Sequence, residues 1–281
     1  MTATHVPTHR LLDGRTIPQV GFGTYPMQGE ECVRAVRDAI AAGYRLIDTA
    51  VNYDNEAAVG EGIRQSGVAR AELFVTSKLP GRDHGYDDAV ASVHASLERL
   101  GLDHLDLHLI HWPNPRVGQY VEAWRALVDL QKEGLIASVG VSNFTEEHLT
   151  RIIDATGVTP VVNQIELHPH FPQPEMRAVH ERLGIRTEAW SPLGKRQAPF
   201  GEPPVADAAE RHGVTPAQVI LRWHLQLGSL PIPKSADPER MRSNLDVFGF
   251  ELSDDEVAAI SGLARPDGRL FGGDPDTHQE M

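Results

Sequence analysis

Four polar residues in the first half of the chain have the side-chain types needed to protonate a carbonyl oxygen at neutral pH. They are Asp48, Tyr53, Lys78 and His111. Asp48, Lys78 and His111 each end a short apolar run of strand character. The ends of successive buried strands are where a parallel barrel gathers its catalytic side chains. We therefore expect these four residues to lie together.

The chemistry expected of these residues follows from the charge that a carbonyl group develops. A hydride added to the carbonyl carbon leaves negative charge on the oxygen, and a donor must protonate that oxygen. A free tyrosine is a weak acid with a pKa of about 10, but a nearby ammonium group lowers that pKa. We expect Lys78 to supply this charge to Tyr53, and Asp48 to neutralise Lys78, because an unpaired buried charge is costly. His111 would hydrogen-bond the carbonyl oxygen and orient it.

Composition and charge indicate a soluble globular protein. The chain has 281 residues, of which 41% are hydrophobic and 23% charged. Its net charge of −13 disfavours binding to nucleic acid or to anionic membranes. Cys32 is the only cysteine, residues 1–10 are polar, and no apolar stretch is long enough to span a bilayer. We expect a cytoplasmic protein and, because no exposed apolar stripe stands out, a monomer.

Short apolar runs alternate with amphipathic stretches along the whole chain. We expect strands at residues 20–23, 44–48, 73–78, 105–111, 136–142, 161–166, 186–190 and 229–232. Helices with apolar spacing near 3.6 are expected at residues 30–42, 55–66, 87–100, 119–133, 145–155, 173–183 and 216–227, followed by another at 237–245. Residues 195–204 are expected to form a Pro-rich loop.

This alternation of strands and helices predicts the fold. About eight strand–helix units, with no linker or break in composition, predict an α/β protein with a parallel sheet in one domain over residues 1–281. The number of units favours a closed (β/α)8 TIM barrel over an open sheet. An Asp-Gly turn predicts a β-hairpin within residues 1–19, at the N-terminal mouth of the barrel. An extra helix at residues 253–262 and a tail at 264–281 would complete the chain.

Several specific motifs occur in order along the chain. They are Gly21-Phe-Gly-Thr-Tyr, Gly43-Tyr-Arg-Leu-Ile-Asp-Thr-Ala, Tyr53 with Asn55-Glu56, Leu107-His-Leu-Ile-His-Trp-Pro, Gly140-Val-Ser-Asn-Phe, Asn163-Gln-Ile-Glu-Leu-His-Pro, Trp190-Ser-Pro-Leu-Gly and Ile232-Pro-Lys-Ser. On these motifs the chain resembles the aldo-keto reductase family from end to end, and within it the bacterial diketogluconate reductases. The family's catalytic tetrad falls on the four residues above without a substitution. The resemblance implies a (β/α)8 barrel that reduces aldehydes or ketones with NADPH.

The resemblance also implies where the nicotinamide end of NADPH would lie. Ser142, Asn143 and Gln164 would hydrogen-bond the nicotinamide carboxamide. Trp190 would stack on the nicotinamide ring and fix which face points at the substrate. Residues along the pyrophosphate path would be Ser191, Leu193 and Gly194.

The adenosine end of NADPH is implied to bind near residues 232–244. Lys234, Ser235 and Arg240 would hold the 2′-phosphate, helped by the dipole of a helix that begins near Pro238. Ser243 stands where many family members have Glu, which leaves the discrimination against NADH open. Further cofactor contacts are implied at Thr24, Asp48, Ile232, Ala236 and Asn244.

The substrate pocket is implied to be aromatic. Tyr25, Trp112 and the tail around Leu270 and Phe271 would wall the carbonyl site, with His111 in its floor. The short loop at residues 112–118 suggests an open pocket for small aldehydes, for α-dicarbonyls such as methylglyoxal, or for keto sugars. We expect a small-molecule carbonyl substrate and broad specificity.

Two other kinds of protein compete with this interpretation. A metal-dependent barrel hydrolase could use His104, His108 and His111, or His168 with His170. However, His108 and His111 are separated by an odd number of residues and would point to opposite faces of a strand, so we expect no metal. The other alternative is a non-catalytic, NADPH-binding regulatory subunit, against which the intact tetrad argues.

Overall fold

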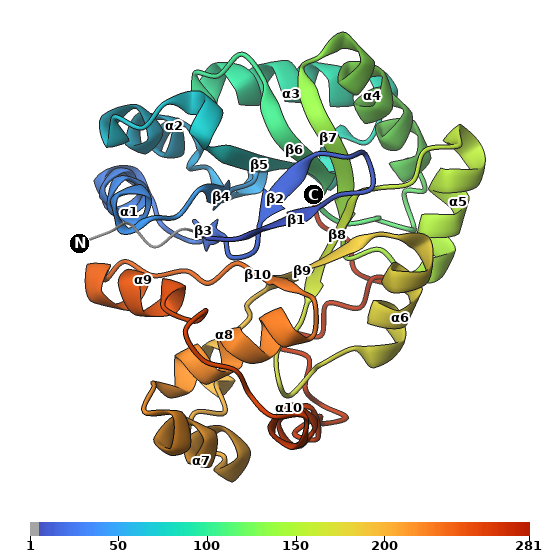
Figure 1. The fold of residues 1–281 in the computed structure, drawn as a ribbon. Coiled ribbons are helices and arrows are strands. Elements are labelled where there is room, and N and C mark those ends of the chain that lie inside the picture. The colour runs from blue at the N-terminus through green and yellow to red at the C-terminus, as the bar shows by residue number, and fades with distance from the viewer. Residues whose placement is uncertain (1–5) are drawn as a thin grey trace.

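Eight parallel strands form one sheet in chain order in the structure, a computed structural model that describes residues 6–281 (Figure 1). They are β3 (Phe22–Gly23), β4 (Leu46–Asp48), β5 (Phe74–Leu79), β6 (Leu105–Ile110), β7 (Ile136–Ser142), β8 (Val162–Glu166), β9 (Arg186–Trp190) and β10 (Leu230–Pro231). The first and last segments meet through backbone hydrogen bonds from Gly21 N–H to the Pro231 oxygen, at 3.0 Å, and from Gly23 N–H to the Pro233 oxygen, at 3.2 Å. These bonds close the sheet, and the predicted (β/α)8 barrel is confirmed.

Helices surround this barrel (Figure 1). They are α1 (Gly29–Ala42), α2 (Glu56–Ser66), α3 (Tyr86–Leu100), α4 (Tyr120–Glu133), α5 (Glu146–Thr156), α6 (Pro174–Leu183), α7 (Pro203–His212), α8 (Pro216–Gln226), α9 (Pro238–Leu245) and α10 (Asp254–Ser261). Short 3₁₀ turns are η1 (Val51–Tyr53), η2 (Arg70–Glu72), η3 (Gly81–Asp83) and η4 (Lys195–Gln197). The predicted elements are all present, with ends that differ from the predicted bounds by two residues or fewer.

Within residues 6–281, α7 is the one α-helix that the sequence pattern did not predict. It begins at Pro203, inside the stretch expected to be a Pro-rich loop. Pro203 and Pro204 suggested a loop, but proline also fits the first turn of a helix, where a backbone N–H has no intrahelical partner. Val205 and Ala208 are buried in an apolar cluster with residues of α8. The predicted loop is therefore wrong at its C-terminal end.

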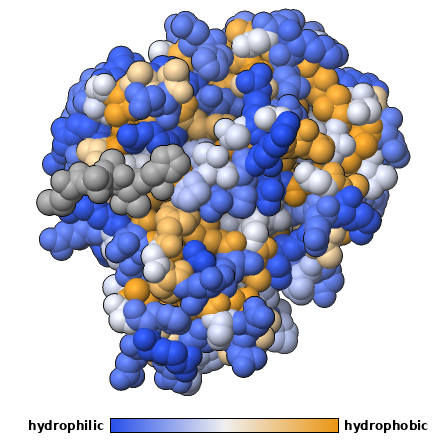
Figure 2. Space-filling view, viewed as in Figure 1, coloured by the Kyte–Doolittle hydropathy of each residue, from blue (hydrophilic) through white to orange (hydrophobic). Residues whose placement is uncertain are grey.

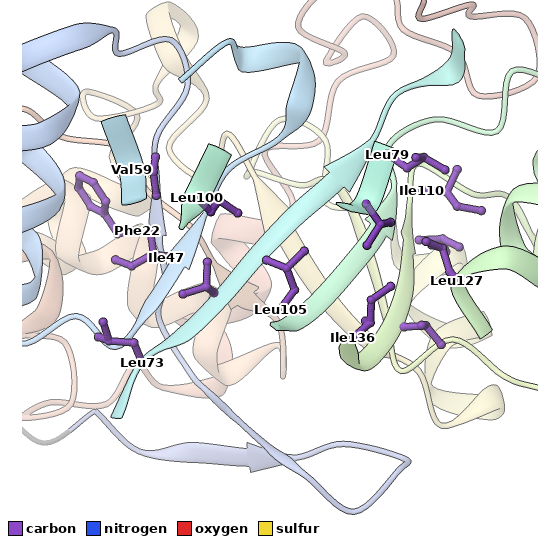
Figure 3. Close-up of a cluster of buried hydrophobic side chains, with 14 of the residues drawn as sticks. Phe22, Ile47, Val59, Leu73, Leu79, Leu100, Leu105, Ile110, Leu127 and Ile136 are labelled. Carbon is purple, nitrogen blue, oxygen red and sulfur yellow. The ribbon is translucent and has the colours of Figure 1, made fainter. Parts of the chain in front are cut away.

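Side-chain alternation along the strands separates the barrel interior from the layer under the helices. Leu46 and Phe74 are paired in register and belong to the interior cluster. Ile47, the next residue on β4, belongs instead to the larger cluster between sheet and helices, which Figure 3 shows. Asp48 and Lys78 follow Leu46 and Phe74 at even spacing, so they face the interior at the carboxyl ends of the strands.

The hairpin of β1 (Thr8–Arg10) and β2 (Thr16–Pro18) lies across the amino-terminal end of the barrel (Figure 1). Ile17 is fully buried and belongs to the interior cluster. The Ser138 hydroxyl on β7 donates a hydrogen bond to Asp13 Oδ2 in the hairpin turn, at 2.6 Å. The predicted hairpin is therefore confirmed, and it leaves the carboxyl ends of the strands as the open end of the barrel.

The surface at the hairpin end is mostly hydrophilic, with apolar residues showing between the polar ones (Figure 2). Within residues 6–281, no helix has both the length and the apolar composition that a bilayer-spanning helix requires.

The segment that follows α10 returns to the open end of the barrel. The rings of Phe271 and His278 pack against Trp112, with centroid distances of 6.1 and 4.3 Å. A Cβ atom on Gly81 would collide with the Asn114 side chain and with the backbone of Glu280. Glycine at position 81 therefore lets this tail approach the loops that follow β5 and β6.

Candidate active site

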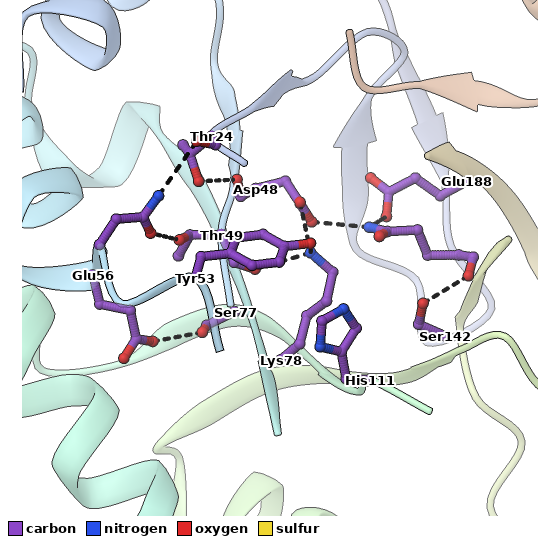
Figure 4. Close-up of polar contacts among 12 residues, drawn as sticks. Thr24, Asp48, Thr49, Tyr53, Glu56, Ser77, Lys78, His111, Ser142 and Glu188 are labelled. Atoms are coloured by element: carbon purple, nitrogen blue, oxygen red, sulfur yellow. Dashed lines mark hydrogen bonds and ion pairs between the residues drawn. The ribbon is translucent and has the colours of Figure 1, made fainter. Parts of the chain in front are cut away.

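The open end of the barrel brings the four predicted catalytic residues together (Figure 4). Lys78 Nζ lies 2.6 Å from Asp48 Oδ1, 2.9 Å from the Thr49 carbonyl oxygen and 3.4 Å from Tyr53 Oη. The rings of Tyr53 and His111 pack edge to face, with centroids 5.6 Å apart. Ammonium, carboxylate, phenol and imidazole thus form one cluster.

The backbone explains why these residues meet. Asp48 ends β4 and pairs in register with Thr76 on β5. Lys78 is two residues after Thr76, so it projects from the neighbouring strand to the same side. Tyr53 ends the 3₁₀ turn η1, and the centre of its ring lies 5.0 Å from Lys78 Nζ. His111 follows β6, and its N–H donates to the Leu79 carbonyl oxygen at 3.0 Å.

Burial dominates the acidity of the tyrosine. It raises the pKa of Tyr53 to about 12; the Lys78 ammonium opposes this rise, and the charges of Asp48 and Glu280 add to it. The sequence predicts that Lys78 lowers this pKa below that of a free tyrosine. Lys78 does act in that direction, but desolvation of the phenol outweighs it, so the predicted net lowering is wrong. Tyr53 therefore keeps its proton at neutral pH.

The Lys78–Asp48 pair is completely enclosed. The side chains of Lys78 and Asp48 are 0% and 3% exposed. Burial alone would lower the pKa of Lys78, but Asp48 and Tyr53 outweigh burial and the pKa is raised. The lysine stays charged, and removing either partner would leave an uncompensated charge in the barrel interior.

A chain of polar groups continues from Asp48 across the barrel (Figure 4). Gln164 Nε2 donates to Asp48 Oδ2 and to Glu188 Oε2, both at 2.9 Å. Gln164 and Glu188 are paired in register on β8 and β9, so their side chains are neighbours. Glu188 is not among the residues predicted from the sequence. Its place two residues before Trp190 on one strand was the available signal that it faces the interior.

The predicted nicotinamide-binding residues lie next to this row of hydrogen-bonded side chains. Asn143 Nδ2 donates to the His111 carbonyl oxygen at 3.0 Å, and Asn143 Oδ1 accepts from Trp190 Nε1 at 2.8 Å. The Ser142 hydroxyl donates to the Gln164 carbonyl oxygen at 2.8 Å. Because Gln164 gives its Nε2 hydrogens to two carboxyl groups, its Oε1 is the atom that can accept a hydrogen bond from a ligand amide.

The predicted phosphate-binding residues form a separate group at the start of α9. Lys234 and Arg240 are exposed, while the Ser235 hydroxyl bonds to the backbone of Asp237. Asp237 caps α9, and its carboxylate accepts from the N–H groups of Glu239 and Arg240 at 2.8 and 3.0 Å. This carboxylate occupies the N–H groups at the start of α9 and places a negative charge at the helix end that was expected to attract phosphate. If a phosphate group binds here, its attraction would have to come from the two basic side chains.

The remaining predicted cofactor positions belong to several segments and differ in burial. The Thr24 hydroxyl donates to the Asp48 carbonyl oxygen at 3.0 Å. Ser191 and Gly194 have left-handed backbone, with φ of 51° and 78°. The other positions are Ile232 and Asn244, which are buried, Leu193, which is half-buried, and Ala236, which is exposed.

Aromatic rings stand around the tetrad as the resemblance implied. The ring of Tyr25 lies 5.0 Å from that of Tyr53 and is half exposed. Lys195 Nζ lies 5.5 Å from the centre of the Tyr25 ring. Phe271 stands between Trp112 and Trp190, at 6.1 and 5.7 Å.

A carboxylate from the tail also reaches the tetrad. Glu280 Oε1 lies 2.7 Å from His111 Nδ1 and accepts from Asn52 Nδ2 at 2.6 Å. Burial acts to raise the pKa of Glu280, but His111, Asn52 and the Gly81 N–H outweigh it, so the pKa is lowered. No pattern in the sequence pointed to Glu280.

A pocket of about 210 Å³ lies next to Asn143. Because Asn143 bonds to the backbone of His111, this pocket adjoins the tetrad. Residues that line it include Phe144, Glu166, Gln173, Met176, Arg269 and Asp276.

The histidines considered as metal ligands do not converge. His108 is fully buried, and His168 Nε2 lies 3.0 Å from Glu166 Oε1. Across the part of the chain that the structure describes, no three His, Cys, Asp or Glu side chains are grouped to hold a metal ion.

The aldo/keto reductase family matches residues 19–198 and 203–265 of the chain. The chain belongs to this family. The aldo/keto reductase is 58% identical over 277 residues to 2,5-diketo-D-gluconic acid reductase B of Corynebacterium sp. (strain SHS752001), with 99% of each chain covered. It is 46% identical over 269 residues to methylglyoxal reductase DkgA of Escherichia coli (strain K12), covering 95% of this chain and 96% of that one.

Solved structures agree with this assignment. The aldo/keto reductase resembles a variant of Gox0644 crystallised in complex with NADPH, with a TM-score of 0.93 and 48% identity. The match covers 98% of this chain and 99% of that one. The family resemblance inferred from the motifs is therefore confirmed, and the protein is an oxidoreductase.

Proposed function

We propose that this aldo/keto reductase reduces aldehydes and ketones to alcohols with NADPH, with Tyr53 as the proton donor. The observation that carries the proposal is the contact of Tyr53 Oη with the buried Lys78 ammonium, 3.4 Å away, which Asp48 holds at 2.6 Å. NADPH, when bound, supplies a hydride to the carbonyl carbon. As the C=O π electrons move to oxygen, the Tyr53 hydroxyl gives that oxygen its proton.

Each member of the tetrad has a separate task in this proposal. Tyr53 is protonated at neutral pH and can donate. Lys78 stabilises the phenolate that remains after donation, and Asp48 keeps Lys78 charged and in place. His111 orients the carbonyl oxygen. General acid catalysis of this kind is typically worth about 10²–10⁴-fold in rate.

The cofactor is assigned to the residues that adjoin the tetrad. Gln164 Oε1 is free to accept from the nicotinamide carboxamide, and Trp190 is held by Asn143 in position to stack on the ring. Lys234 and Arg240 present exposed positive charge to the 2′-phosphate, although the chain as a whole is acidic. The NADPH complex of Gox0644, a protein of the same fold, supports this assignment.

The substrates are proposed to be small carbonyl compounds. Tyr25, Trp112 and Phe271 give the site aromatic walls, while Tyr53 and His111 are its polar groups. Relatives named for methylglyoxal and for 2,5-diketo-D-gluconic acid support α-dicarbonyls and keto sugars as candidates.

A turnover screen tests this function. Purified protein is mixed with NADPH and a panel of methylglyoxal, simple aldehydes and 2,5-diketo-D-gluconate, and NADPH absorbance is followed, with NADH as the control. We expect oxidation of NADPH with several members of the panel. NADPH binding without turnover of any carbonyl would instead favour a non-catalytic role.

A further inference from the structure

Glu188 is a buried carboxyl group next to the tetrad that the proposed mechanism does not use. It is 0% exposed on the interior face of β9. Its Oε2 accepts from Gln164 Nε2 at 2.9 Å, whereas its Oε1 has no hydrogen-bond partner among the described residues. The same amide nitrogen donates to Asp48 Oδ2. Two carboxyl groups therefore share one amide in a part of the barrel that is closed to solvent.

The charges around Glu188 do not balance if both carboxyl groups are ionised. Asp48 faces it from β4 and Lys78 from β5, and β10 contributes no titratable residue. On β8 its direct neighbour is the neutral Gln164, and the buried Glu166, two residues further on, contacts His168 and the Leu270 N–H instead. Arg186, two residues earlier on β9, turns towards the Gly228 carbonyl oxygen. Lys78 is in direct contact with Asp48, so a Glu188 carboxylate would be an unpaired buried anion, which is strongly unfavourable.

A proton on Glu188 removes this conflict. Burial raises the pKa of Glu188 to about 8, and the charge of Asp48 adds to the rise, while Gln164 and Lys78 oppose it. As a neutral acid, Glu188 still accepts the Gln164 hydrogen bond through Oε2. An unpaired oxygen of a neutral acid also loses less on burial than one of a carboxylate.

We propose that Glu188 is a positioning residue that works as a neutral acid: it fixes the Gln164 amide against Asp48, and loss of its proton sets the alkaline limit of the reductase. The effect on turnover rests on the proposed function, whereas the inference that buried Glu188 carries a proton does not. The step is a simple ionisation, in which the acid gives its proton to solvent hydroxide and water forms. The new negative charge would compete for Lys78 and make Tyr53 a weaker donor.

Thermal unfolding at several pH values tests the buried proton without any substrate. The pKa of Glu188 in the folded protein, about 8, lies above the ordinary value of 4.5. The contribution of protonated Glu188 to the free energy of unfolding is therefore fully present at low pH and is lost as pH rises through the pKa of the folded protein. Glu188→Gln removes this ionisation and keeps an oxygen to accept from Gln164. We expect the Tm of Glu188→Gln relative to wild type to rise between about pH 5 and about pH 9.

Two further measurements complete the thermal test. Glu251→Gln changes an exposed glutamate, 77% exposed, and should show the same difference from wild type at every pH. If Glu188→Gln behaves like Glu251→Gln, the buried proton is contradicted. If Glu188→Gln does not fold, infrared spectra of the wild type decide: a carboxylic acid band at neutral pH that fades as pH rises supports the proposal, and its absence at neutral pH overturns it.

The pH profile of NADPH oxidation tests the role in turnover. In wild type, kcat should fall as pH rises through about 8, and in Glu188→Gln the fall should move to higher pH. Glu188→Leu removes the acceptor for Gln164, so it should lose activity at every pH, and the Gln variant should restore part of it. An unchanged alkaline limit in Glu188→Gln overturns this role. A wild type without turnover at any pH contradicts the proposed function as well. The Tm series needs no turnover, so it tests the protonation of Glu188 independently.

Discussion

The Glu280 carboxylate lies 2.7 Å from Nδ1 of the His111 imidazole. The backbone of Glu280 is itself held by Asn114, which accepts its N–H at 3.0 Å, and Asn52 donates to its carboxylate at 2.6 Å. A residue near the end of the sequence thereby contacts the His111 ring, which we propose orients the substrate, although the two are far apart in sequence.

Removing the Glu280 side chain should impair catalysis without abolishing it. A hydrogen-bonded contact with a charged group contributes about 1.5–3 kcal/mol, so Glu280→Ala should lower kcat/KM by about 10- to 100-fold. Steady-state kinetics with one aldehyde measure this loss. Asp267→Asn, an exposed change in the same tail, is the control. Equal activity of Glu280→Ala and the control would show that His111 does not depend on the tail.

The buried ion pair should be coupled in stability. Lys78→Met leaves Asp48 as an unpaired buried charge and should cost about 3–5 kcal/mol of unfolding free energy. Adding Asp48→Asn removes that charge, so the double variant should be less destabilised than the sum of the two single changes. Urea unfolding of all four proteins measures the coupling. Strict additivity would mean that the two groups do not depend on each other in the folded state.

The basic residues at α9 should discriminate between the two nicotinamide cofactors. Lys234→Ala removes an exposed positive charge assigned to the 2′-phosphate and should weaken NADPH binding by about 10-fold or more. NADH has no such phosphate, so its affinity should change little. Fluorescence titration with both cofactors measures the effect, which should shrink at high salt because the charge is exposed. Equal weakening of both cofactors would remove Lys234 from the phosphate site.

The sequence could predict the barrel and the tetrad because both depend on local patterns. Alternation of apolar residues placed Asp48 and Lys78 at the ends of strands, and the barrel topology brought those ends together. Even the bounds of β7 and β9 agree with the predicted ranges. The helix at Pro203 was missed because two prolines suit both a loop and the first turn of a helix.

Other parts of the site depend on contacts between distant segments. Glu280 reaches His111 only because the tail folds back over the strand ends, and no local pattern reports that path. The net direction of the Tyr53 pKa shift depends on how deeply the fold buries the phenol, which competes with the nearby Lys78 charge. The role inferred for Glu188 depends on its strand register with Gln164 and on the charged groups around it, and neither follows from the local sequence.

The measurement that tests the central claim most directly compares NADPH oxidation by wild type and Tyr53→Phe with a reactive aldehyde, beside NADPH binding followed by tryptophan fluorescence. The substitution removes one hydroxyl and keeps the ring against His111. We predict that Tyr53→Phe binds NADPH as wild type does but loses about 10²–10⁴-fold in kcat. A Tyr53→Phe variant that binds NADPH and turns over the aldehyde at the wild-type rate would contradict the assignment of Tyr53 as the proton donor.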